Sequence, residues 1–461
     1  MINPRSEAIE YLHRNHPGFL KNLTDFASIP SVSTSGEYEL AIQKAAEWVA
    51  AHLKGIGAQN VQILPTGGHP AVYGELCSAS VSAPTVLVYS HYDVQPADPL
   101  ELWISDAFKP AVRGENIYGR GVTDMKGQML AAHNAVEAIH KTSRVPVNIK
   151  FLIEGEEEIG SRNMPGFIAD HKDLLACNLV LNPDTGMHSV DQPSITYALR
   201  GMAYFELRVD GPDHDLHSGT FGGVVHNPAT AICELIAGMH DDQGRVTLPG
   251  FYERVQPLSQ EERGELARLS MDESYYKRQT GIPEGWGEQE YTPVERTSAR
   301  PTLDVNGLVS GFTGEGRKTV LPAWAKAKIS CRLVPDQDPE AVHHQLRQYL
   351  EKHAPSSIRW HLEYVGGSSA SISDRNSVGV MALAQALESV WQKRPVYKRE
   401  GGSVPVVGLF QRILGVESVN TGFSLPNDNL HSPNEKLHLP TWYKGMDALA
   451  LFFFNLAESW R

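Results

Sequence analysis

The chain has 461 residues, of which 41% are hydrophobic, and its formal net charge at pH 7 is −13. This length exceeds the ~250 to 300 residues at which single hydrophobic cores stop growing, so we expect a globular protein of about two domains. The acidic charge is spread along the chain without an acidic tail, and nothing in it indicates nucleic-acid binding.

The first part of the chain alternates helical and strand patterns. Residues 41–56 carry apolar side chains at helical spacing, and residues 85–90 read as a short buried strand. Residues 129–140 are again amphipathic, and residues 147–153 are again strand-like. Such alternation predicts an α/β domain with a mostly parallel sheet and helices on both faces.

The pattern changes near Tyr197. Residues 197–209 and 319–334 alternate like half-exposed strands, and helices are expected at 228–239 and 339–353. An α+β domain with an antiparallel sheet and helices on one face accounts for this order.

The last part of the chain returns to the first pattern, with a long amphipathic helix expected at 374–391 and a short strand at 416–420. The second domain is therefore expected to be an insertion. Residues 285–300 are polar and irregular, and we expect a surface loop there. The expected boundaries are 1–196 and 371–461 for the catalytic domain and 197–370 for the inserted domain.

Acidic and imidazole side chains follow several of the expected strands. They are His91 and Asp93 after 85–90, Asp124 in a glycine-rich turn, Glu156, Glu157 and Glu158 after 147–153, Asp184 after 178–181, and His431 after 416–420. Because ligand sites of α/β sheets lie beyond the carboxyl ends of the strands, these side chains are expected to converge. Zinc takes His nitrogen and Asp or Glu oxygen, and two-metal hydrolases hold ions ~3.5 to 4 Å apart, close enough to share a carboxylate. The pattern predicts a metal centre.

Each of these residues has an ordinary alternative role when it is taken alone. His91 and Asp93 could form a solvated polar strand end, Asp124 could cap a helix, and Asp184 could be a turn residue. In an extended segment, however, side chains two residues apart point the same way, so Asp93 can accept the second imidazole N–H of His91. Their joint occurrence, in order and each after a strand, favours the metal centre.

Five ordered motifs, HYDVQP, GRGVTDMKG, EGEEEIGS, NPDTG and LHSPNEK, closely resemble the M20 family of co-catalytic metallopeptidases. The resemblance extends from about residue 10 to the carboxyl terminus. Within that family, DLHSGTFGG, GEGRKTVLP, CRLVPDQDP and REGGSVPV are most similar to the cytosolic dipeptidase branch. The resemblance implies a zinc-peptidase-like catalytic domain with an inserted lid and dimerisation domain.

The resemblance implies two metal ions per subunit, zinc with manganese or cobalt as alternatives. One ion would be held by His91, Asp124 and Asp184, and the other by Asp124, Glu158 and His431. Glu157 matches the general base of the family, which takes a proton from the metal-bridging water and passes it to the leaving amine. Asp93 matches the residue that orients His91, and Glu156 has no implied role. A cis peptide is implied between Asp124 and Met125.

The resemblance also implies substrate contacts in the inserted domain. Arg332 would receive the substrate carboxylate, Thr319 and Ser403 would contact substrate, and Glu400 would receive its free amino group. His217 would reach into the active site of the neighbouring subunit, which implies a homodimer. A solvated strand-end arginine and an exposed loop histidine are the ordinary alternatives for Arg332 and His217.

The implied activity is metal-dependent hydrolysis of the peptide bond in dipeptides or short peptides. An amidase on N-acylated amino acids, such as a deacetylase or desuccinylase of the same fold, is the nearest alternative, because only the substrate pocket would differ. Carboxypeptidase action on longer peptides is a further alternative. A non-catalytic scaffold is disfavoured by the intact Glu157 and metal positions.

The amino-terminal residues 1–18 are polar and lack the basic-then-apolar order of a secretory signal, and the longest apolar run, 448–454, is too short to span a bilayer. We therefore expect a cytoplasmic protein without membrane contact. The cysteines are widely separated and include no CxxC pair, so reduced, buried thiols are expected at Cys77, Cys177, Cys233 and Cys331.

Overall fold

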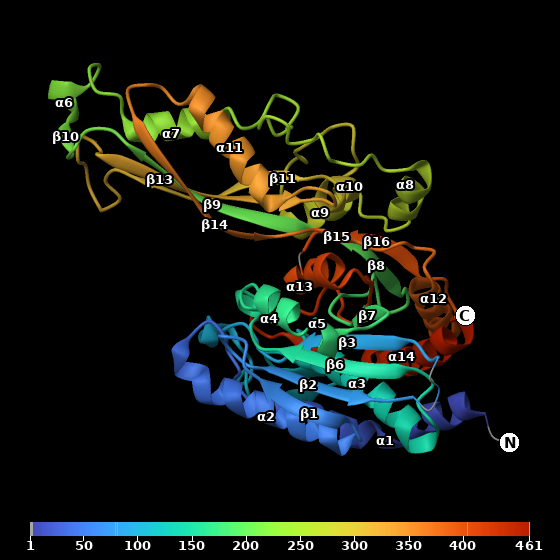
Figure 1. Cartoon of the computed structure of the whole chain (residues 1–461). Coiled ribbons are helices and arrows are strands. Elements are labelled where there is room, and N and C mark those ends of the chain that lie inside the picture. The colour runs from blue at the N-terminus through green and yellow to red at the C-terminus, as the bar shows by residue number, and fades with distance from the viewer. Residues whose placement is uncertain (1–2, 79, 81, 403, 461) are drawn as a thin grey trace. The chain divides into compact units, whose positions relative to one another are not determined.

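The computed structural model describes residues 3–78, 80, 82–402 and 404–460 (Figure 1). The chain divides into two compact units. Unit 1 comprises Met1–Tyr197, Ser373–Lys398 and Val404–Arg461, and unit 2 comprises Ala198–Ile372 and Arg399–Ser403. Unit 2 is therefore inserted in the sequence of unit 1.

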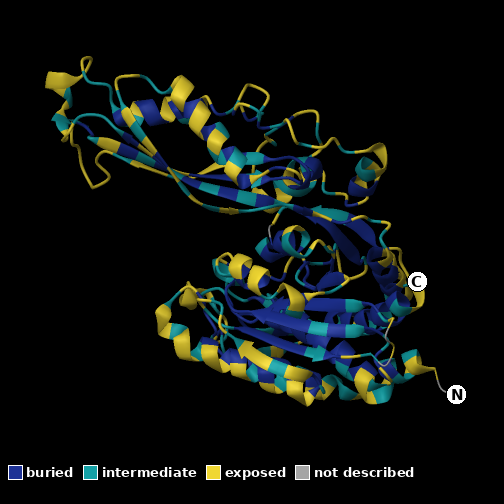
Figure 2. Ribbon diagram, in the orientation of Figure 1, coloured by how far each residue is buried: buried dark blue, intermediate teal, exposed yellow. Residues whose placement is uncertain are grey.

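Unit 1 is built on a sheet whose central strands are parallel. Its order is β1-β2-β6-β3-β7-β17-β8, with parallel pairing of β6 with β3, β3 with β7, and β7 with β17. The strands are β1 (Gln59–Leu64), β2 (Ala71–Leu76), β3 (Thr85–His91), β6 (Asn148–Glu154), β7 (Leu179–Asn182), β8 (Ser194–Leu199) and β17 (Glu417–Asn420). Almost every residue of β3 and β7 is buried, as expected for strands covered on both faces (Figure 2).

Helices of unit 1 pack on this sheet and on one another. Helix α2 packs on β1 and β2, while α1, α3 and α14 pack together and α12 packs on α14. The main helices are α1 (Pro4–Ala27), α2 (Glu39–Gly55), α3 (Lys126–Thr142), α4 (Met164–Asp170), α5 (Lys172–Leu175), α12 (Val378–Trp391), α13 (Pro405–Leu409) and α14 (Leu439–Ser459). A small sheet of β4 (Ala111–Arg113), β5 (Asn116–Tyr118) and β18 (Lys436–His438) joins two distant segments of unit 1.

Unit 2 is built on a four-stranded antiparallel sheet in the order β11-β13-β9-β14. These strands are β9 (Gly201–Asp210), β11 (Thr302–Ser310), β13 (Trp324–Leu333) and β14 (Arg359–Ser368). Alternate side chains of β9, such as Phe205 and Leu207, pack with α7 (Pro228–Ala237) and α11 (Pro339–His353), which cover one face of the sheet (Figure 1). The remaining elements are β10 (Leu216–His217), α6 (Ser218–Phe221), α8 (Gln260–Ala267), α9 (Glu273–Thr280), α10 (Pro293–Ser298), β12 (Val320–Leu321) and β15 (Ser371–Ile372).

The predicted class, an α/β protein with a mostly parallel sheet and a separate antiparallel sheet, is confirmed. Residues 399–402 belong to unit 2, whereas the sequence predicted them in the catalytic domain. The physical reason is their contacts, because Arg399 pairs with Glu262 and the carbonyl of Gly401 accepts a hydrogen bond of 3.0 Å from Arg200 Nε.

The strand expected at 197–209 is two strands, because β8 ends at Leu199 and β9 begins at Gly201. A Cβ at Gly201 would lie 2.4 Å from the carbonyl oxygen of Ser368, so only glycine fits where β9 begins. The strand expected at 319–334 is likewise divided into β12 and β13, on either side of Pro322, which has no N–H to donate.

The expectation of a surface loop at 285–300 is wrong for the second half of the segment. The segment contains helix α10, which begins with a capping box formed by Thr292 and Glu295. Arg300 forms a buried ion pair with Glu288, with Nη2 and Oε2 2.7 Å apart. Three of the polar side chains that suggested a loop, Glu288, Glu295 and Arg300, are buried and form ion pairs inside unit 2.

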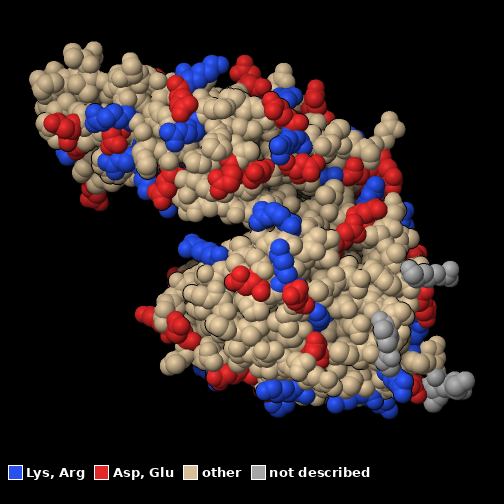
Figure 3. All heavy atoms as spheres, in the orientation of Figure 1, with Lys and Arg blue, Asp and Glu red and all other residues tan. Residues whose placement is uncertain are grey.

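The four cysteines carry free thiols, as predicted, but the expectation that they are buried is wrong for Cys77 and Cys233, which are exposed. Among the described residues, no helix combines the length and the apolar composition needed to span a bilayer. Acidic and basic side chains are interspersed on the face of each unit that Figure 3 shows.

Candidate metal centre

The carboxyl ends of three neighbouring parallel strands in unit 1 carry the predicted ligands. His91 is the last residue of β3, Asp184 lies two residues beyond β7, and Glu157 and Glu158 lie in a 3-10 turn after β6. Asp124 lies just before α3, and His431 lies in the loop before β18. Sheet topology therefore brings together side chains that are more than 300 residues apart in sequence.

Two groups of side chains place their ligand atoms within 4.8 Å of one another: His91, Asp124 and Asp184, and Asp124, Glu158 and His431. His91 Nε2 lies 3.3 Å from Asp124 Oδ1 and 3.7 Å from Asp184 Oδ2. His431 Nε2 lies 2.9 Å from Asp124 Oδ2 and 3.3 Å from Glu158 Oε2. The two oxygens of Asp124 thus face different histidines, which is the arrangement of a shared carboxylate.

The donor set fits divalent cations. His91 Nε2 is buried and makes no hydrogen bond of adequate geometry to any described residue, although carboxylate oxygens lie close to it. A buried ring nitrogen without a partner is unfavourable unless something binds it. One imidazole and two carboxylates in each group match the nitrogen and oxygen ligation of zinc and similar ions.

The carboxylates are too concentrated to be satisfied by the two histidines. Burial raises the pKa of Asp184 to about 7, with the charges of Asp124 and Glu158 adding to the effect against that of His91. Burial and the charge of Asp124 also raise the pKa of Glu158. Hydrogen bonds to Asp124 and Glu158 raise the pKa of His431 to about 10. Positive charge bound among these groups would stabilise the ionised carboxylates and favour the neutral, ligating form of His431.

The contact that orients His91 differs from the prediction. The hydrogen bond of His91 Nδ1, 3.0 Å long, goes to the backbone carbonyl of Asp93, and the carboxylate oxygen Oδ1 lies 3.4 Å away. The carboxylate of Asp93 instead accepts hydrogen bonds from the backbone N–H groups of Glu157 and Glu158, at 3.3 and 3.1 Å. Asp93 therefore contacts both the imidazole and the turn that carries the acidic residues.

Glu157 lies beside the two groups of ligands and belongs to neither. Within the described residues, its carboxylate makes no hydrogen bond or ion pair. Burial raises its pKa well above the usual range, and the charges of Asp184, Glu158 and Asp124 add to this against that of His91. A carboxylate with high proton affinity and no partner suits a proton acceptor.

Several buried or half-buried residues that support the site were missed from the sequence. Glu435, in the LHSPNEK motif, accepts hydrogen bonds from the turn that carries Asp124. Gln95 donates a hydrogen bond of 2.8 Å to Glu158 Oε2. Glu156 accepts hydrogen bonds from the side-chain amide of Asn163 at 2.9 Å and from the backbone N–H of His69 at 3.2 Å, which gives it a structural role. The partners of Glu435 and Gln95 are distant along the chain, so neither residue has a local sequence signal.

The cis peptide implied between Asp124 and Met125 is present.

The predicted substrate residues of unit 2 lie at two ends of its sheet. His217 pairs with Val320, next to Thr319, where β10 meets β12. Arg332 lies near the carboxyl end of β13, close to Arg200. Burial of Arg200 and the positive charge of Arg332 together lower the pKa of Arg200 to about 10. The charge of Glu400 acts on Arg200 in the opposite direction, which places Glu400 in the same region. Ser403 lies outside the described residues.

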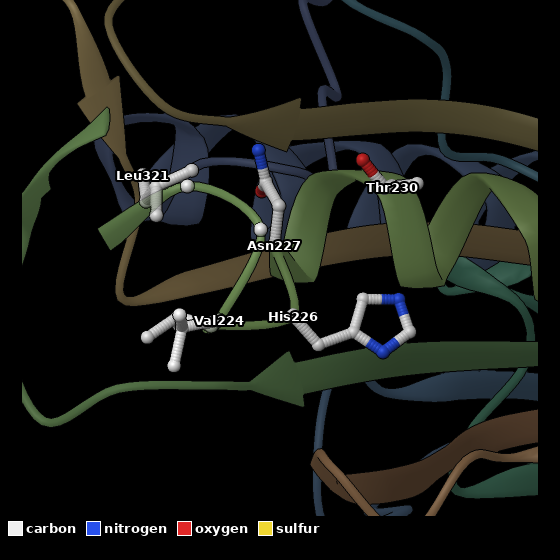
Figure 4. Close-up of a pocket in the computed structure, with 8 residues that line it drawn as sticks. Val224, His226, Asn227, Thr230 and Leu321 are labelled. Carbon is white, nitrogen blue, oxygen red and sulfur yellow. The ribbon is translucent and has the colours of Figure 1, made fainter. Parts of the chain in front are cut away.

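Unit 2 has a pocket of about 400 Å³ near the loop of His217, lined by residues 222–227 together with Thr230 and Leu321 (Figure 4). Two of its polar side chains already have partners within unit 2, since Asn227 caps α7 and His226 Nδ1 lies 2.8 Å from Ser357 Oγ. None of the predicted site residues lines this pocket.

Relatives of known identity share almost the whole chain. Beta-Ala-His dipeptidase of Homo sapiens is 30% identical, with 98% of this chain and 92% of the relative covered. Cys-Gly metallodipeptidase DUG1 of Candida albicans is 29% identical, with 97% and 96% covered. The solved structure of the M20 family metallo-carboxypeptidase Sso-CP2 from Sulfolobus solfataricus is 32% identical, covers 95% of this chain and 99% of that one, and has a TM-score of 0.86.

Residues 87–455 match the model of peptidase family M20/M25/M40. This span begins within β3, just before His91, and includes every predicted metal ligand. The resemblance that five short motifs indicated is confirmed, and the chain belongs to peptidase family M20/M25/M40.

Proposed function

We propose that the protein is a metal-dependent dipeptidase that binds two divalent ions in unit 1. The observation that carries the proposal is the pair of three-residue groups sharing Asp124, with the unpaired carboxylate of Glu157 beside them. Relatives named as dipeptidases across nearly the whole chain support this substrate class over N-acylated amino acids.

His91, Asp124 and Asp184 would hold one ion, and Asp124, Glu158 and His431 the other. When bound, divalent ions would polarise a substrate carbonyl and lower the pKa of water enough to make it a nucleophile at neutral pH. The mixed nitrogen and oxygen ligation fits zinc, and manganese or cobalt can take the same ligands.

Glu157 would act as the general base. Its carboxylate takes one proton from the attacking water while the water oxygen bonds to the peptide carbonyl carbon. When the carbon–nitrogen bond breaks, Glu157 gives this proton to the leaving nitrogen, and the products are a carboxylic acid and a free amine. Asp93 positions both His91 and Glu157 for this step, since it contacts both through hydrogen bonds.

Arg332 would bind the substrate carboxylate with its planar guanidinium, and Glu400 would bind the free amino group. Arg200 donates a hydrogen bond to the carbonyl of Gly401 and so fixes the backbone next to Glu400. Thr319 and Ser403 would contact other polar groups of the substrate. Recognition of both charged ends favours short, unblocked peptides.

We further propose a homodimer in which His217 completes the active site of the other subunit. Eight residue steps separate Trp324 from Arg332 along β13. His217 lies beyond the Trp324 end, and at ~3.4 Å per residue it is therefore about 27 Å or more from Arg332. One dipeptide cannot touch both residues of the same unit 2, so a shared site requires His217 from a second copy.

Carboxypeptidase action is the second candidate. The metallo-carboxypeptidase Sso-CP2 is 32% identical over 95% of this chain, which is as similar as the dipeptidase relatives. A dipeptidase accepts a substrate of two residues only, whereas a carboxypeptidase also accepts peptides that continue on the amino-terminal side of the cleaved bond.

A hydrolysis panel tests the proposal. We expect zinc-loaded protein to cleave free dipeptides, with little activity on the N-acetyl and N-succinyl derivatives of the same amino acids. Activity on acylated compounds alone would contradict the dipeptidase proposal, and release of carboxyl-terminal residues from pentapeptides at a similar rate would favour the carboxypeptidase. A cytoplasmic location stays a prediction, which cell fractionation would test.

A further inference from the structure

Glu435 is a buried carboxylate at the centre of a hydrogen-bond cluster next to the metal centre. Its Oε2 accepts from Arg120 Nη1 at 2.7 Å and from the backbone N–H of Gly121 at 2.9 Å. Its Oε1 accepts from the backbone N–H groups of Thr123 at 2.9 Å and Asp124 at 3.1 Å. The side chains of Arg120 and Glu435 are 1% and 0% exposed, so each charge depends on the other and on these backbone groups in place of water.

The Arg120–Glu435 pair joins three segments that each carry a metal ligand. Arg120 Nη2 donates to the carbonyl of Pro96, five residues beyond His91, at 3.1 Å, and lies 3.4 Å from the carbonyl of Ser432, next to His431. Glu435 holds the turn that ends in Asp124. A backbone hydrogen bond of 3.0 Å from Gly119 N to the carbonyl of Glu435 closes the same junction.

The ligands do not depend equally on this pair. His91 is held as the last residue of β3, and Asp184 follows two residues after β7, so regular sheet pairing positions both. His431 lies in a loop and has a positive φ of 58°. Asn429 and Asn434 in the same loop also have positive φ angles, of 57° and 62°. A side chain in such a loop is positioned only as well as its flanking backbone is held.

We propose that the Arg120–Glu435 pair positions Asp124 against His431 and thereby sets the metal affinity of the Asp124–Glu158–His431 group selectively. The pair is a positioning device, because neither side chain is a ligand. Partners of this kind typically change metal affinity roughly 10- to 100-fold. This inference rests on the two-ion assignment proposed above.

The test is a zinc titration of metal-free protein against a competing chelator, with bound zinc counted by elemental analysis. Wild-type protein is expected to bind two ions per chain. Glu435→Gln is expected to bind one ion with near wild-type affinity and the second roughly 10- to 100-fold more weakly. Glu288→Gln is the matched control, because it breaks a buried ion pair with Arg300 in unit 2 and should leave both affinities unchanged.

Cobalt substitution identifies which ion is weakened. At one equivalent of Co²⁺, the visible spectrum of Glu435→Gln should match that of His431→Ala and differ from that of Asp184→Asn. If Glu435→Gln does not fold by circular dichroism, Arg120→Lys, which keeps the positive charge but loses the second donor nitrogen, is judged by the same criteria.

The outcomes separate the two proposals. Fewer than two ions in wild-type protein would overturn the two-ion assignment itself. Two ions in the wild type, with unchanged or equally weakened affinities in the variant, would overturn the positioning role of the pair.

Discussion

The metal centre of unit 1 and the substrate residues of unit 2 are built on opposite principles. In unit 1, ligands at the ends of neighbouring parallel strands meet at one edge of the sheet, within 4.8 Å of one another. In unit 2, Arg332 lies near the carboxyl end of β13, whereas His217 lies in β10, which pairs with β12 before β13 begins. The strand ends of unit 1 bring the candidate ligands together within one chain, whereas the separation of His217 from Arg332 is the reason for the dimer proposed above.

The largest expected effect is on the unit 1 side of this comparison. Glu157→Gln should lower turnover by roughly two to four orders of magnitude, because it removes the proton acceptor without removing a ligand. Steady-state kinetics on a free dipeptide, with bound metal counted in parallel, measures this. Retained metal with an unchanged rate would remove Glu157 from its role.

The next effect tests whether unit 2 acts between subunits. His217→Ala and Arg332→Ala should each be nearly inactive because each loses a substrate contact. When the two variants are unfolded, mixed in equal amounts and refolded, about a quarter of the sites should regain both residues if dimers assort at random. Activity in that mixture supports the exchange of His217.

One outcome would contradict that conclusion, and one control is needed. A mixture that stays inactive while each variant still forms dimers would contradict the exchange. Refolded wild-type protein, treated in the same way, is the control for losses during refolding.

A smaller effect is expected from Arg332→Lys. Lysine keeps the charge but loses the planar fork of donors that binds a carboxylate through two hydrogen bonds. With one such bond lost, worth ~1.5 to 3 kcal/mol, we expect KM for a free dipeptide to rise by roughly one to two orders of magnitude. Equal KM values for Arg332→Lys and wild type would argue that this arginine does not touch the substrate.

The smallest effect is expected on the stability of unit 2, from a substitution at Gly201, where β9 begins. Gly201→Ala would place a Cβ 2.4 Å from the carbonyl oxygen of Ser368 and 2.5 Å from the nitrogen of Ala370. We expect destabilisation of unit 2 by ~1 to 3 kcal/mol, as for other overpacked sites, with metal content unchanged. Thermal unfolding measures the first effect and elemental analysis the second, and a loss of metal would show that the units are not independent.

Local patterns in the sequence predicted the strands of unit 1 well, and the candidate ligands that follow them lie together in the structure. The residues 85–90 and 178–181 read correctly as buried strands, and the polar residues after them lie where such strands end. The helix expected at 339–353 has those bounds in the structure. These features depend on hydrophobic runs and helical spacing, which are local properties.

Features that depend on distant contacts were not predictable. Glu435 and Arg120 are 315 residues apart, and neither has a neighbour in sequence that signals a buried ion pair. The break at Gly201 depends on the close approach of Ser368, and the buried Arg300–Glu288 pair reads as ordinary loop polarity. In contrast, α10 had a local signal, since Thr292, Pro293 and Glu295 together are typical of a helix start.

The most direct test of the two-ion centre is the metal content of the purified protein, measured together with dipeptide hydrolysis before and after chelation. We expect two divalent ions per chain, loss of hydrolysis when a chelator removes them, and recovery when zinc, manganese or cobalt is returned. Full hydrolysis of free dipeptides by protein that holds no metal would contradict the account.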